Sequence, residues 1–373
     1  MSPRSVRWAS VTLGVALAGL LTGTVAPAGA AGSTAAANLS AKASGFNTAG
    51  DVLVADQFNN RVIEVDSNGN IVWQFGKGPN DFSAQSIIGV NDAQRVGPLT
   101  LMAGTGDPAG SPPSGDLCPD PNGCPDNRVM LVNQAGQIVW QYGQFGVAGS
   151  DRDQLNTPVQ ATWLPRADVL ITDQANERII EVNLAHRIVW QYGMTGVSGT
   201  GFDQLNNPNS AELLANGNIL ISDENNNRAI EVNRQKQIVH TFTAGGTVSG
   251  VAFASRLANG DTLLTDSNNS RAVEVDANDD VVWQYVTNTD MGSNPNPLPT
   301  RAVRLRNGDT LISDQFNHRV IEVTPAGAVV RQLGNLNAFG FDPSHVGPLD
   351  APYDAKVVGD YTGLTPPFGG RFG

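Results

Sequence analysis

The chain has 373 residues, with 23 Lys and Arg against 35 Asp and Glu and a formal net charge of −12. This acidic balance argues against nucleic acid and anionic membrane surfaces as partners, because both are bound through clustered Lys and Arg. The 41 Gly and 22 Pro residues favour a chain of many short strands and turns.

The N-terminus has the pattern of a secretion signal. Arg4 and Arg7 precede an apolar stretch over residues 11–25, and Ala28-Gly29-Ala30 then matches the small-x-small pattern of a signal peptidase site. A transmembrane anchor is the alternative, but the apolar stretch is short for one. We therefore predict a secreted protein with a signal peptide over residues 1–30, cleaved near Ala30, and no membrane insertion by any later segment.

Two cysteines, Cys118 and Cys124, stand six residues apart in Cys-Pro-Asp-Pro-Asn-Gly-Cys. A secreted protein matures in an oxidising compartment, so we expect a disulfide between them. Metal binding is the alternative, but the sequence offers neither a second pair of cysteines nor a nearby histidine.

One sequence unit recurs along the rest of the chain. It reads Asp-x-x-Asn-x-Arg, then an apolar strand ending in Glu-Val, then a strand of the Ile-Val-Trp-Gln type. Short β-branched runs bounded by Asn, Asp and Gly predict three strands in each unit. The copies are Gly50–Gly76, the degenerate Pro125–Gly143, Ala167–Gly193, Gly217–Thr243, Gly260–Val286 and Gly308–Gly334.

A fourth strand precedes each unit. Four strands in roughly 40–50 residues are typical of a propeller blade. The sequence therefore predicts an all-β fold, a six-bladed β-propeller of four-stranded antiparallel blades over residues 50–360, with an insertion at 104–126 in the second blade. The leading strands are expected at 96–103, 158–164, 208–214, 251–257 and 299–305.

The leading strand of the first blade is expected from the C-terminus. Residues 351–358 repeat the Pro and Ala positions of the other leading strands, yet no unit follows them. Such a strand would close the ring and remove free sheet edges. An alternative assigns this inner strand to residues 39–46, within an N-terminal extension over 31–49; residues 361–373 form a C-terminal tail.

At these residues the chain resembles the NHL-repeat propellers, whose unit pairs a glycine-rich loop and a Pro-initiated strand with an Asp-x-x-Asn-x-Arg hairpin. The loops GQFGVAGSDRDQLNTP and GMTGVSGTGFDQLNNP, which end at Pro158 and Pro208, carry this pattern. The hairpin and the Ile-Val-Trp-Gln strand are also similar to bacterial arylsulfotransferase-type and quinoprotein-like propellers. The resemblance covers nearly the whole mature chain and implies the fold, but propellers host many unrelated functions.

Residues that repeat from blade to blade are interpreted as structural, because a catalytic group is normally needed once. We expect each repeated Arg to pair with the Asp at its turn in a bidentate way. The Trp of the outermost strand is expected to pack between neighbouring blades. The repeated positions are Asp56, Asp173, Asp223, Asp266 and Asp314 with an Asn and an Arg three and five residues later, Glu64, Glu181, Glu231, Glu274 and Glu322, and Trp73, Trp140, Trp190 and Trp283.

Positions at which the units differ are the candidates for function. We predict that Gln160, Asn209, Arg301, Tyr353 and Asp354 bind a ligand at the channel mouth. Arg301 and Asp354 fall on adjacent blades, where they would form a salt bridge or bind a small polar or anionic ligand. The aligned mouth positions are Thr100, Gln160, Ser210, Phe253, Arg301 and Asp354, with Asn209 and Tyr353 beside them.

Two histidines are candidates for catalysis. His318 lies between the second and third strands of its unit and His345 in the loop before the closing strand. We expect both to face the channel entrance, where either could act as a base or nucleophile beside Arg301. A lone surface histidine is more often inert.

The second-blade insertion is a candidate calcium site. Asp116, Asp120, Asn122 and Asp126 crowd it and could offer oxygen ligands, although Pro- and Asp-rich loops look the same without an ion. No cofactor is predicted, and the sequence has no G-x-S-x-G, H-E-x-x-H or phosphate-loop motif.

Two hypotheses for function follow. The favoured one is a secreted, monomeric β-propeller that acts as a binding module for an extracellular protein or a small polar ligand. The alternative is a secreted propeller enzyme, sulfotransferase- or lyase-like, with its site at the channel mouth. There Arg301 would hold an anionic group and His318 or His345 would transfer it.

Overall fold

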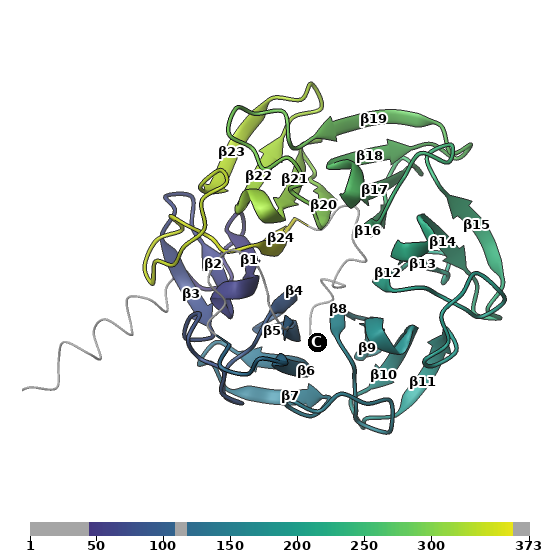
Figure 1. The fold of residues 1–373 in the computed structure, drawn as a ribbon, viewed down its shortest axis with the longest axis horizontal. Helices are drawn as coiled ribbons and strands as arrows, with labels where there is room; N and C mark the ends of the chain where they lie inside the picture. Colours follow the sequence, from purple (N-terminus) through teal and green to yellow (C-terminus); the bar gives the residue numbers. More distant parts are fainter. Residues whose placement is uncertain (1–44, 109–117, 361–373) are drawn as a thin grey trace, which may run out of the picture. The chain divides into compact units, whose positions relative to one another are not determined.

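The structure, a computed structural model, describes residues 45–108 and 118–360, and these form six four-stranded antiparallel sheets. The sheets are blades around a central channel, with β24, β4, β8, β12, β16 and β20 innermost (Figure 1). The predicted six-bladed propeller is confirmed. The predicted signal peptide, residues 31–44 of the extension and the C-terminal tail lie outside the described residues. No helix within the described residues is long and apolar enough to cross a membrane.

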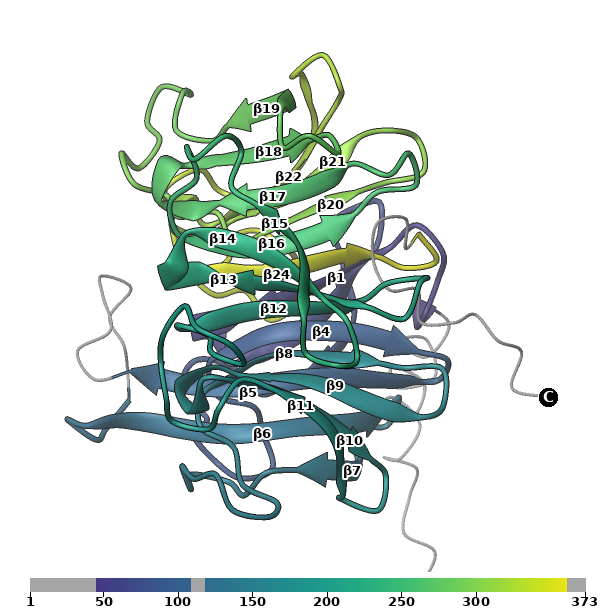
Figure 2. The ribbon, with the colours of Figure 1, turned by 90° about the vertical axis from the view of Figure 1, so that its right-hand side faces the viewer.

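The strands of each blade follow one another from the channel to the rim, and in the side view the strands run side by side across the body (Figure 2). The strands, given from the channel outward, are as follows. Blade 1 is β24 (Pro352–Val357), β1 (Val52–Asp56), β2 (Arg61–Val65) and β3 (Ile71–Phe75); blade 2 is β4 (Val90–Val96), β5 (Leu99–Pro108), β6 (Gly123–Asn133) and β7 (Ile138–Tyr142); blade 3 is β8 (Pro158–Trp163), β9 (Asp168–Asp173), β10 (Arg178–Asn183) and β11 (Ile188–Tyr192). Blade 4 is β12 (Pro208–Leu213), β13 (Ile219–Asp223), β14 (Arg228–Val232) and β15 (Ile238–Phe242); blade 5 is β16 (Val251–Arg256), β17 (Thr262–Asp266), β18 (Arg271–Val275) and β19 (Val281–Val286); blade 6 is β20 (Arg301–Arg304), β21 (Thr310–Asp314), β22 (Arg319–Val323) and β23 (Val329–Gly334).

The C-terminal strand closes the ring as predicted. β24 pairs antiparallel with β1, with Val357 opposite Val52 and Ala355 opposite Val54. The alternative inner strand at 39–46 is wrong, because β24 occupies that place. Phe46 instead packs edge-on against Trp73 of the outermost strand β3, with ring centroids 5.6 Å apart.

The Asp-x-x-Asn-x-Arg motif builds the hairpin between the second and third strands. In five blades a short 3-10 turn ends in a left-handed residue, such as Asn60 at φ 48°, a conformation that Asn tolerates well. The Arg Nε then donates to one oxygen of the Asp carboxylate at 2.6–2.8 Å. The predicted pairing is confirmed, although these five contacts are made through Nε to a single oxygen instead of the bidentate arrangement.

The leading strand of blade 2 was predicted at the wrong place. Residues 99–108 form the second strand, β5, and the inner strand is β4, which reads Val-Asn-Asp-Ala-Gln-Arg-Val. This sequence concealed a strand because Asn91, Asp92, Gln94 and Arg95 are polar, although Val90, Ala93 and Val96 join the apolar core. Thr100 therefore leaves the channel mouth, and Asp92, opposite Ala103, takes the position of Gln160, which lies opposite Thr172.

Blade 2 keeps the hairpin ion pair although its sequence has lost the motif. Asp126 accepts from Arg128 Nε at 2.5 Å and from Nη2 at 3.2 Å, so this pair alone among the described hairpins is bidentate. Gly104 replaces the usual Asp, and a Cβ on it would lie 2.5 Å from Asp126 Oδ2. The carboxylate has thus moved to another strand and fills the space that the glycine leaves.

The segment predicted as an insertion lengthens this hairpin. β5 and β6 continue beyond the other blades, with Asp107 opposite Cys124 and Pro108 opposite Gly123. The predicted disulfide is present, with Cys118 and Cys124 Cα atoms 5.8 Å apart, and ties the chain at the start of β6.

Neighbouring blades are joined at the rim by the repeated Trp and Glu residues. Each Trp Nε1–H donates to a backbone carbonyl in the outer turn of the next blade, as Trp73 does to Gln134 at 3.0 Å. Four of the repeated Glu carboxylates pair with an Arg of the next blade, for example Glu274 with Arg304 at 2.6 Å. Their interpretation as structural residues is confirmed.

We expect Asp126→Asn to lower the free energy of unfolding by about 3 kcal/mol, because it strands the buried Arg128 charge. Asp266→Asn is the matched control. Its partner Arg271 is partly exposed and also bonds to Gln284 and Thr247, so a loss of about 1 kcal/mol is expected. Urea denaturation measures both, and equal losses would contradict this account.

Candidate functional site

Side chains of the inner strands bond to the backbone of the following blade. In four successive blades, a side-chain oxygen at the channel accepts a hydrogen bond from an alanine N–H on the next inner strand. The pairs are Asp354 with Ala93 at 3.2 Å, Asp92 with Ala161 at 3.2 Å, Gln160 with Ala211 at 2.6 Å, and Ser210 with Ala254 at 3.2 Å. One oxygen each of Gln160 and Asp354, two predicted ligand residues, is therefore used to hold blades together.

Arg301 crosses the channel from blade 6. Its guanidinium donates to the carbonyl oxygens of Val159 at 3.3 Å, Asn209 at 3.4 Å and Ala252 at 3.2 Å, in blades 3, 4 and 5. The side chain is 1% exposed. Among the described residues no carboxylate forms an ion pair with it, so neutral acceptors carry most of its stabilisation.

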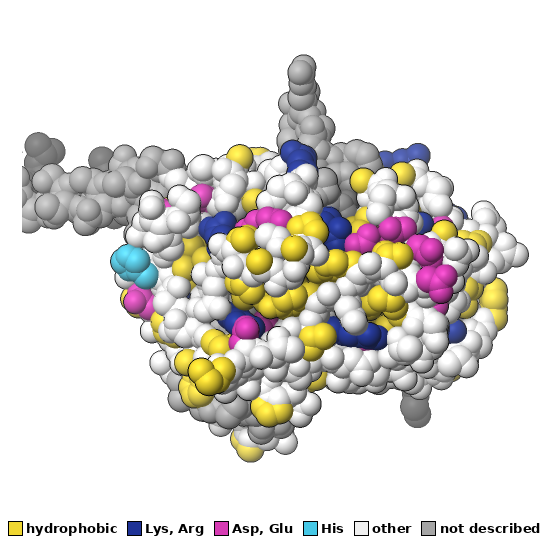
Figure 3. Space-filling model, turned by 90° about the horizontal axis from the view of Figure 1, so that it is seen from above, with side chains coloured by type: hydrophobic (Ala, Val, Ile, Leu, Met, Phe, Trp, Pro, Cys, Tyr) yellow, Lys and Arg dark blue, Asp and Glu magenta, His cyan; other side chains and the backbone are white. Residues whose placement is uncertain are grey.

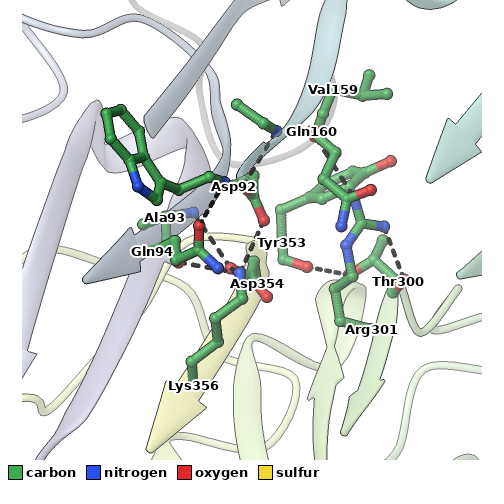
Figure 4. Close-up of polar contacts among 12 residues, drawn as sticks. Asp92, Ala93, Gln94, Val159, Gln160, Thr300, Arg301, Tyr353, Asp354 and Lys356 are labelled. Atoms are coloured by element: carbon green, nitrogen blue, oxygen red, sulfur yellow. Dashed lines mark hydrogen bonds and ion pairs between the residues drawn. The ribbon is translucent and has the colours of Figure 1, made fainter. Parts of the chain in front are cut away.

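Tyr353 and Asn209 cross the channel at the same level. The Tyr353 hydroxyl and the Asn209 side chain are hydrogen-bonded at 2.9 Å, which joins blade 1 to the opposite blade 4. Asn209 Oδ1 also accepts from Arg301 at 3.1 Å, and the Arg301 guanidinium lies 5.0 Å from the centre of the Tyr353 ring (Figure 4). The structure thus brings together Arg301, Asn209 and Tyr353 as predicted, but as a buried cluster that fills the channel.

A carboxylate stands behind this cluster at the hairpin end of the channel. Glu224 Oε2 accepts from the amides of Asn207 at 3.0 Å and Asn209 at 2.9 Å. Burial raises the pKa of Glu224, while the amide of Asn209 and the charge of Arg301 act in the opposite direction. Glu224 therefore orients the amides of Asn207 and Asn209 and forms no ion pair with Arg301 among the described residues.

The expected salt bridge between Arg301 and Asp354 is wrong. Asp354 instead contacts Lys356, two residues along the same strand, and Lys356 Nζ also donates to Asp92 at 2.8 Å and to the Ala93 carbonyl at 2.9 Å (Figure 4). Side chains at positions i and i+2 of a strand share a face, so the lysine on β24 lies nearer to Asp354 than the arginine of the neighbouring blade does.

Asp92, Asp354 and Lys356 form a buried triad, in which Asp92 and Lys356 have shifted pKa values. Burial raises the pKa of Asp92 to about 6; the charge of Lys356 opposes the rise and that of Asp354 adds to it. The two carboxylates raise the pKa of Lys356 despite its burial. The lysine is therefore a cation at neutral pH, held between two acids.

A narrow cavity lies beside Asp92, Asp354 and Lys356, on the side of Arg301 away from the hairpins. It has room for about one water molecule, and its empty space reaches about 280 Å³ only when the part open to solvent is included. Asp92, Gln160 and Phe253 line it nearer to Arg301. The rest of the wall lies two residues further along the inner strands and is formed by Gln94, Thr162, Glu212 and Lys356. The candidate site is therefore inside the channel and not at the hairpin mouth.

Two amide groups point into this cavity. Gln160 Oε1 accepts from the Ala211 N–H, and Gln94 Oε1 accepts from the Trp163 N–H at 2.8 Å. Because the oxygens face the backbone, the NH2 groups turn to the cavity that both residues line. Neither NH2 group has a hydrogen-bond partner among the described residues, so both are free to donate to a ligand.

Glu212 is the acid of the cavity wall. Its Oε2 accepts from the Arg256 N–H at 2.9 Å, and it forms no ion pair within the described part of the chain. Burial raises the pKa of Glu212 to about 8, and the Arg256 N–H, the Ser255 hydroxyl and the Arg256 charge offset only part of that effect. At neutral pH the carboxyl is therefore mostly protonated.

Neither histidine lies where catalysis was predicted. His318 is buried, and its Nδ1 accepts from the Ala351 N–H at 3.1 Å, which fixes the loop before β24. His345 is exposed and forms an isolated bridge with Asn70, beside the outermost strand β3. No hydrogen bond joins either ring to Arg301 among the described residues, so the predicted catalytic group is not assembled.

The proposed calcium ligands are dispersed. Both oxygens of Asp126 bond to Arg128, and Asp120 accepts from the backbone and side chain of Asn122 at 2.9 and 3.0 Å. Asp116 lies outside the described residues. Within the described ranges, no group of three or more His, Cys, Asp or Glu residues has the geometry of a metal site.

Sequence reasoning missed Asp92, Gln94, Glu212 and Lys356. Asp92 and Gln94 were missed because β4 was misplaced. Glu212 and Lys356 stand two residues after mouth positions, and the period of two along a strand was the signal that could have found them.

Comparison with known proteins supports the fold and no activity. No protein-family model matches the chain, and no curated protein matches it. A structure of a protein of unknown function from Bacteroides caccae is similar with a TM-score of 0.52 and 15% identity, over 76% of this chain and 93% of that one. Virginiamycin B lyase from Staphylococcus aureus has a TM-score of 0.45 and 12% identity, over 67% and 71% of the two chains. The resemblance to NHL-repeat propellers is not confirmed beyond the propeller fold.

Glu212 is expected to make stability depend on pH. Its pKa is raised to about 8 in the folded state from 4.5, so its contribution is full below pH 4.5 and is lost as the pH rises through 8. At about 1.4 kcal/mol per pKa unit, the loss is of the order of 5 kcal/mol. Urea denaturation between pH 5 and 9 should show this loss in the wild type and a smaller one in Glu212→Gln; parallel profiles would contradict it.

Proposed function

We propose that this chain is a secreted β-propeller that binds a small polar ligand inside its channel. The observation that carries the proposal is the pair of Gln94 and Gln160 NH2 groups, which face a cavity and have no partner among the described residues. Neither nitrogen is among the buried unpartnered atoms, so both reach the space that opens to solvent, where a ligand can replace water as their acceptor. Two donors aimed at one space therefore favour a ligand that accepts from both.

The ligand is expected to enter from the end of the channel away from the hairpins. The cluster of Arg301, Tyr353 and Asn209 is buried and crosses the channel on the hairpin side of the cavity. Phe253 adds an apolar wall beneath the ligand. A small apolar surface with a few fixed polar groups is the usual composition of a ligand site.

Secretion is supported by the basic and apolar pattern of the first thirty residues and by the disulfide between Cys118 and Cys124. The protein recovered from culture medium should begin at Ala31. N-terminal sequencing checks this, and a chain that keeps residues 1–30 in the cell membrane would contradict it.

Gln160→Glu tests the binding site. The glutamate keeps an oxygen for the Ala211 N–H but presents an oxygen to the cavity in place of the NH2 donor. For a ligand identified by calorimetry from a panel of polyols, sugars, amides and amino acids, we expect the affinity to fall about tenfold or more.

Gln235→Glu is the matched control, since Gln235 is exposed in an outer turn, and it should bind as the wild type does. A panel in which nothing binds, or a ligand that binds Gln160→Glu as tightly as the wild type, would overturn the proposed function.

A further inference from the structure

The groups that line the cavity favour ligands of one charge class. We propose that the cavity selects a small uncharged molecule through an accepting carbonyl-type oxygen, as in an amide, and that Glu212 donates to this oxygen as a carboxylic acid. The inference rests on the proposed ligand-binding function and narrows it to a chemical class.

Three donors converge on the cavity from three successive blades. Gln94 of β4 and Gln160 of β8 contribute NH2 groups whose direction is fixed by backbone bonds to their oxygens. Glu212 of β12 is the third: its Oε2 accepts from the Arg256 N–H, and its carboxyl group, which also lies near the Ser255 hydroxyl, lines the cavity. An oxygen with two lone pairs is the natural partner for such a set.

Glu212 keeps its proton at neutral pH because its surroundings do not supply a free cation. The guanidinium of Arg256, on β16, is engaged by Glu231 at 3.0 Å and by Thr262 at 3.1 Å. Burial consequently dominates the pKa of Glu212, which rises to about 8. Across the cavity, Lys356 faces Glu212 but is bound to its own two carboxylates.

The fixed charges around the cavity exclude ions of either sign. The Asp92 and Asp354 carboxyl groups both contact Lys356, so the three groups leave no net positive charge to attract an anion. An ammonium ion is disfavoured because it would offer only donors to the three donors of the protein. The positive charge of Lys356, which also lines the cavity, would repel it as well. An uncharged acceptor meets neither difficulty.

The test uses three probes of similar size, namely acetamide, acetate and ethylammonium. The full-length secreted protein carries methyl groups at Ala161 and Ala211 in the cavity wall, and their NMR signals report binding directly. At about pH 6.5, acetamide should bind at least roughly fivefold more tightly than either ion, as expected for one charge-mismatched contact. Equal or tighter binding of acetate or ethylammonium would overturn the inference.

The role of Glu212 is tested by pH. Acetamide affinity should fall by about fivefold or more between about pH 6.5 and 9.5 as the acid loses its proton. Glu212→Gln keeps an oxygen for the Arg256 N–H and an NH2 donor for the ligand, so its affinity should stay constant over this range. Glu177→Gln is the matched control: Glu177 likewise accepts a backbone N–H, from Asn207 at 2.6 Å, but lies outside the cavity, and this variant should follow the wild type.

The outcomes separate the two proposals. If a ligand of the larger panel binds and is sensitive to Gln160→Glu, but acetamide is not preferred or the wild type shows no pH dependence, the inference fails and the proposed function stands. If no compound shifts the Ala161 and Ala211 methyl signals, both fail.

Discussion

The contact on which the channel depends is the span of Arg301 from blade 6 to the backbone of blades 3, 4 and 5. A guanidinium offers five donors in a rigid plane, and carbonyls exposed at the start of the inner strands accept from it. Tyr353 and Asn209 add a second diametric link at the same level. Opposite blades are thereby held at a fixed separation, which contacts between neighbouring blades alone would leave adjustable.

Polar inner strands have a structural reason as well as a functional one. Each of Asp354, Asp92 and Gln160 uses one oxygen to bond the next blade. In a low-dielectric interior such bonds are costly to leave unmade, so the side chains adopt defined orientations. The atoms left over, chiefly the NH2 groups of Gln94 and Gln160, are then held in fixed orientations, so the proposed ligand would cost these side chains little conformational entropy.

The rim of the molecule contrasts with this interior. Figure 3 shows hydrophobic side chains gathered on one outer face between patches of basic and acidic residues. Val281 and Val282 of β19 and Val329 and Val330 of β23 are each between 42% and 57% exposed. These pairs occur where the outermost strands begin, and the described contacts do not show what would cover them.

The sequence predicted what repeats and failed where the copies differ. The closing strand, the hairpins, the disulfide and the Trp contacts follow from periodicity and spacing, because each blade needs the same bonds. β4 was missed, since a strand lined by a polar channel lacks the apolar alternation used to recognise strands. The pairing of Asp126 with Arg128 was missed because the carboxylate changed strands. The period of two along a strand places Glu212 and Lys356 on the same face as the mouth positions before them, but which side chains meet across blades far apart in sequence needs the fold.

Closure by β24 has a consequence for how the site comes into being. Tyr353, Asp354 and Lys356 lie on the last described strand, whereas Asp92 and Gln94 lie near the other end of the chain. During synthesis the cavity therefore remains incomplete until β24 docks beside β1. Chains interrupted before that point would contain nearly all of the blades and yet be unable to capture a ligand, so ligand binding would report that the chain has been finished.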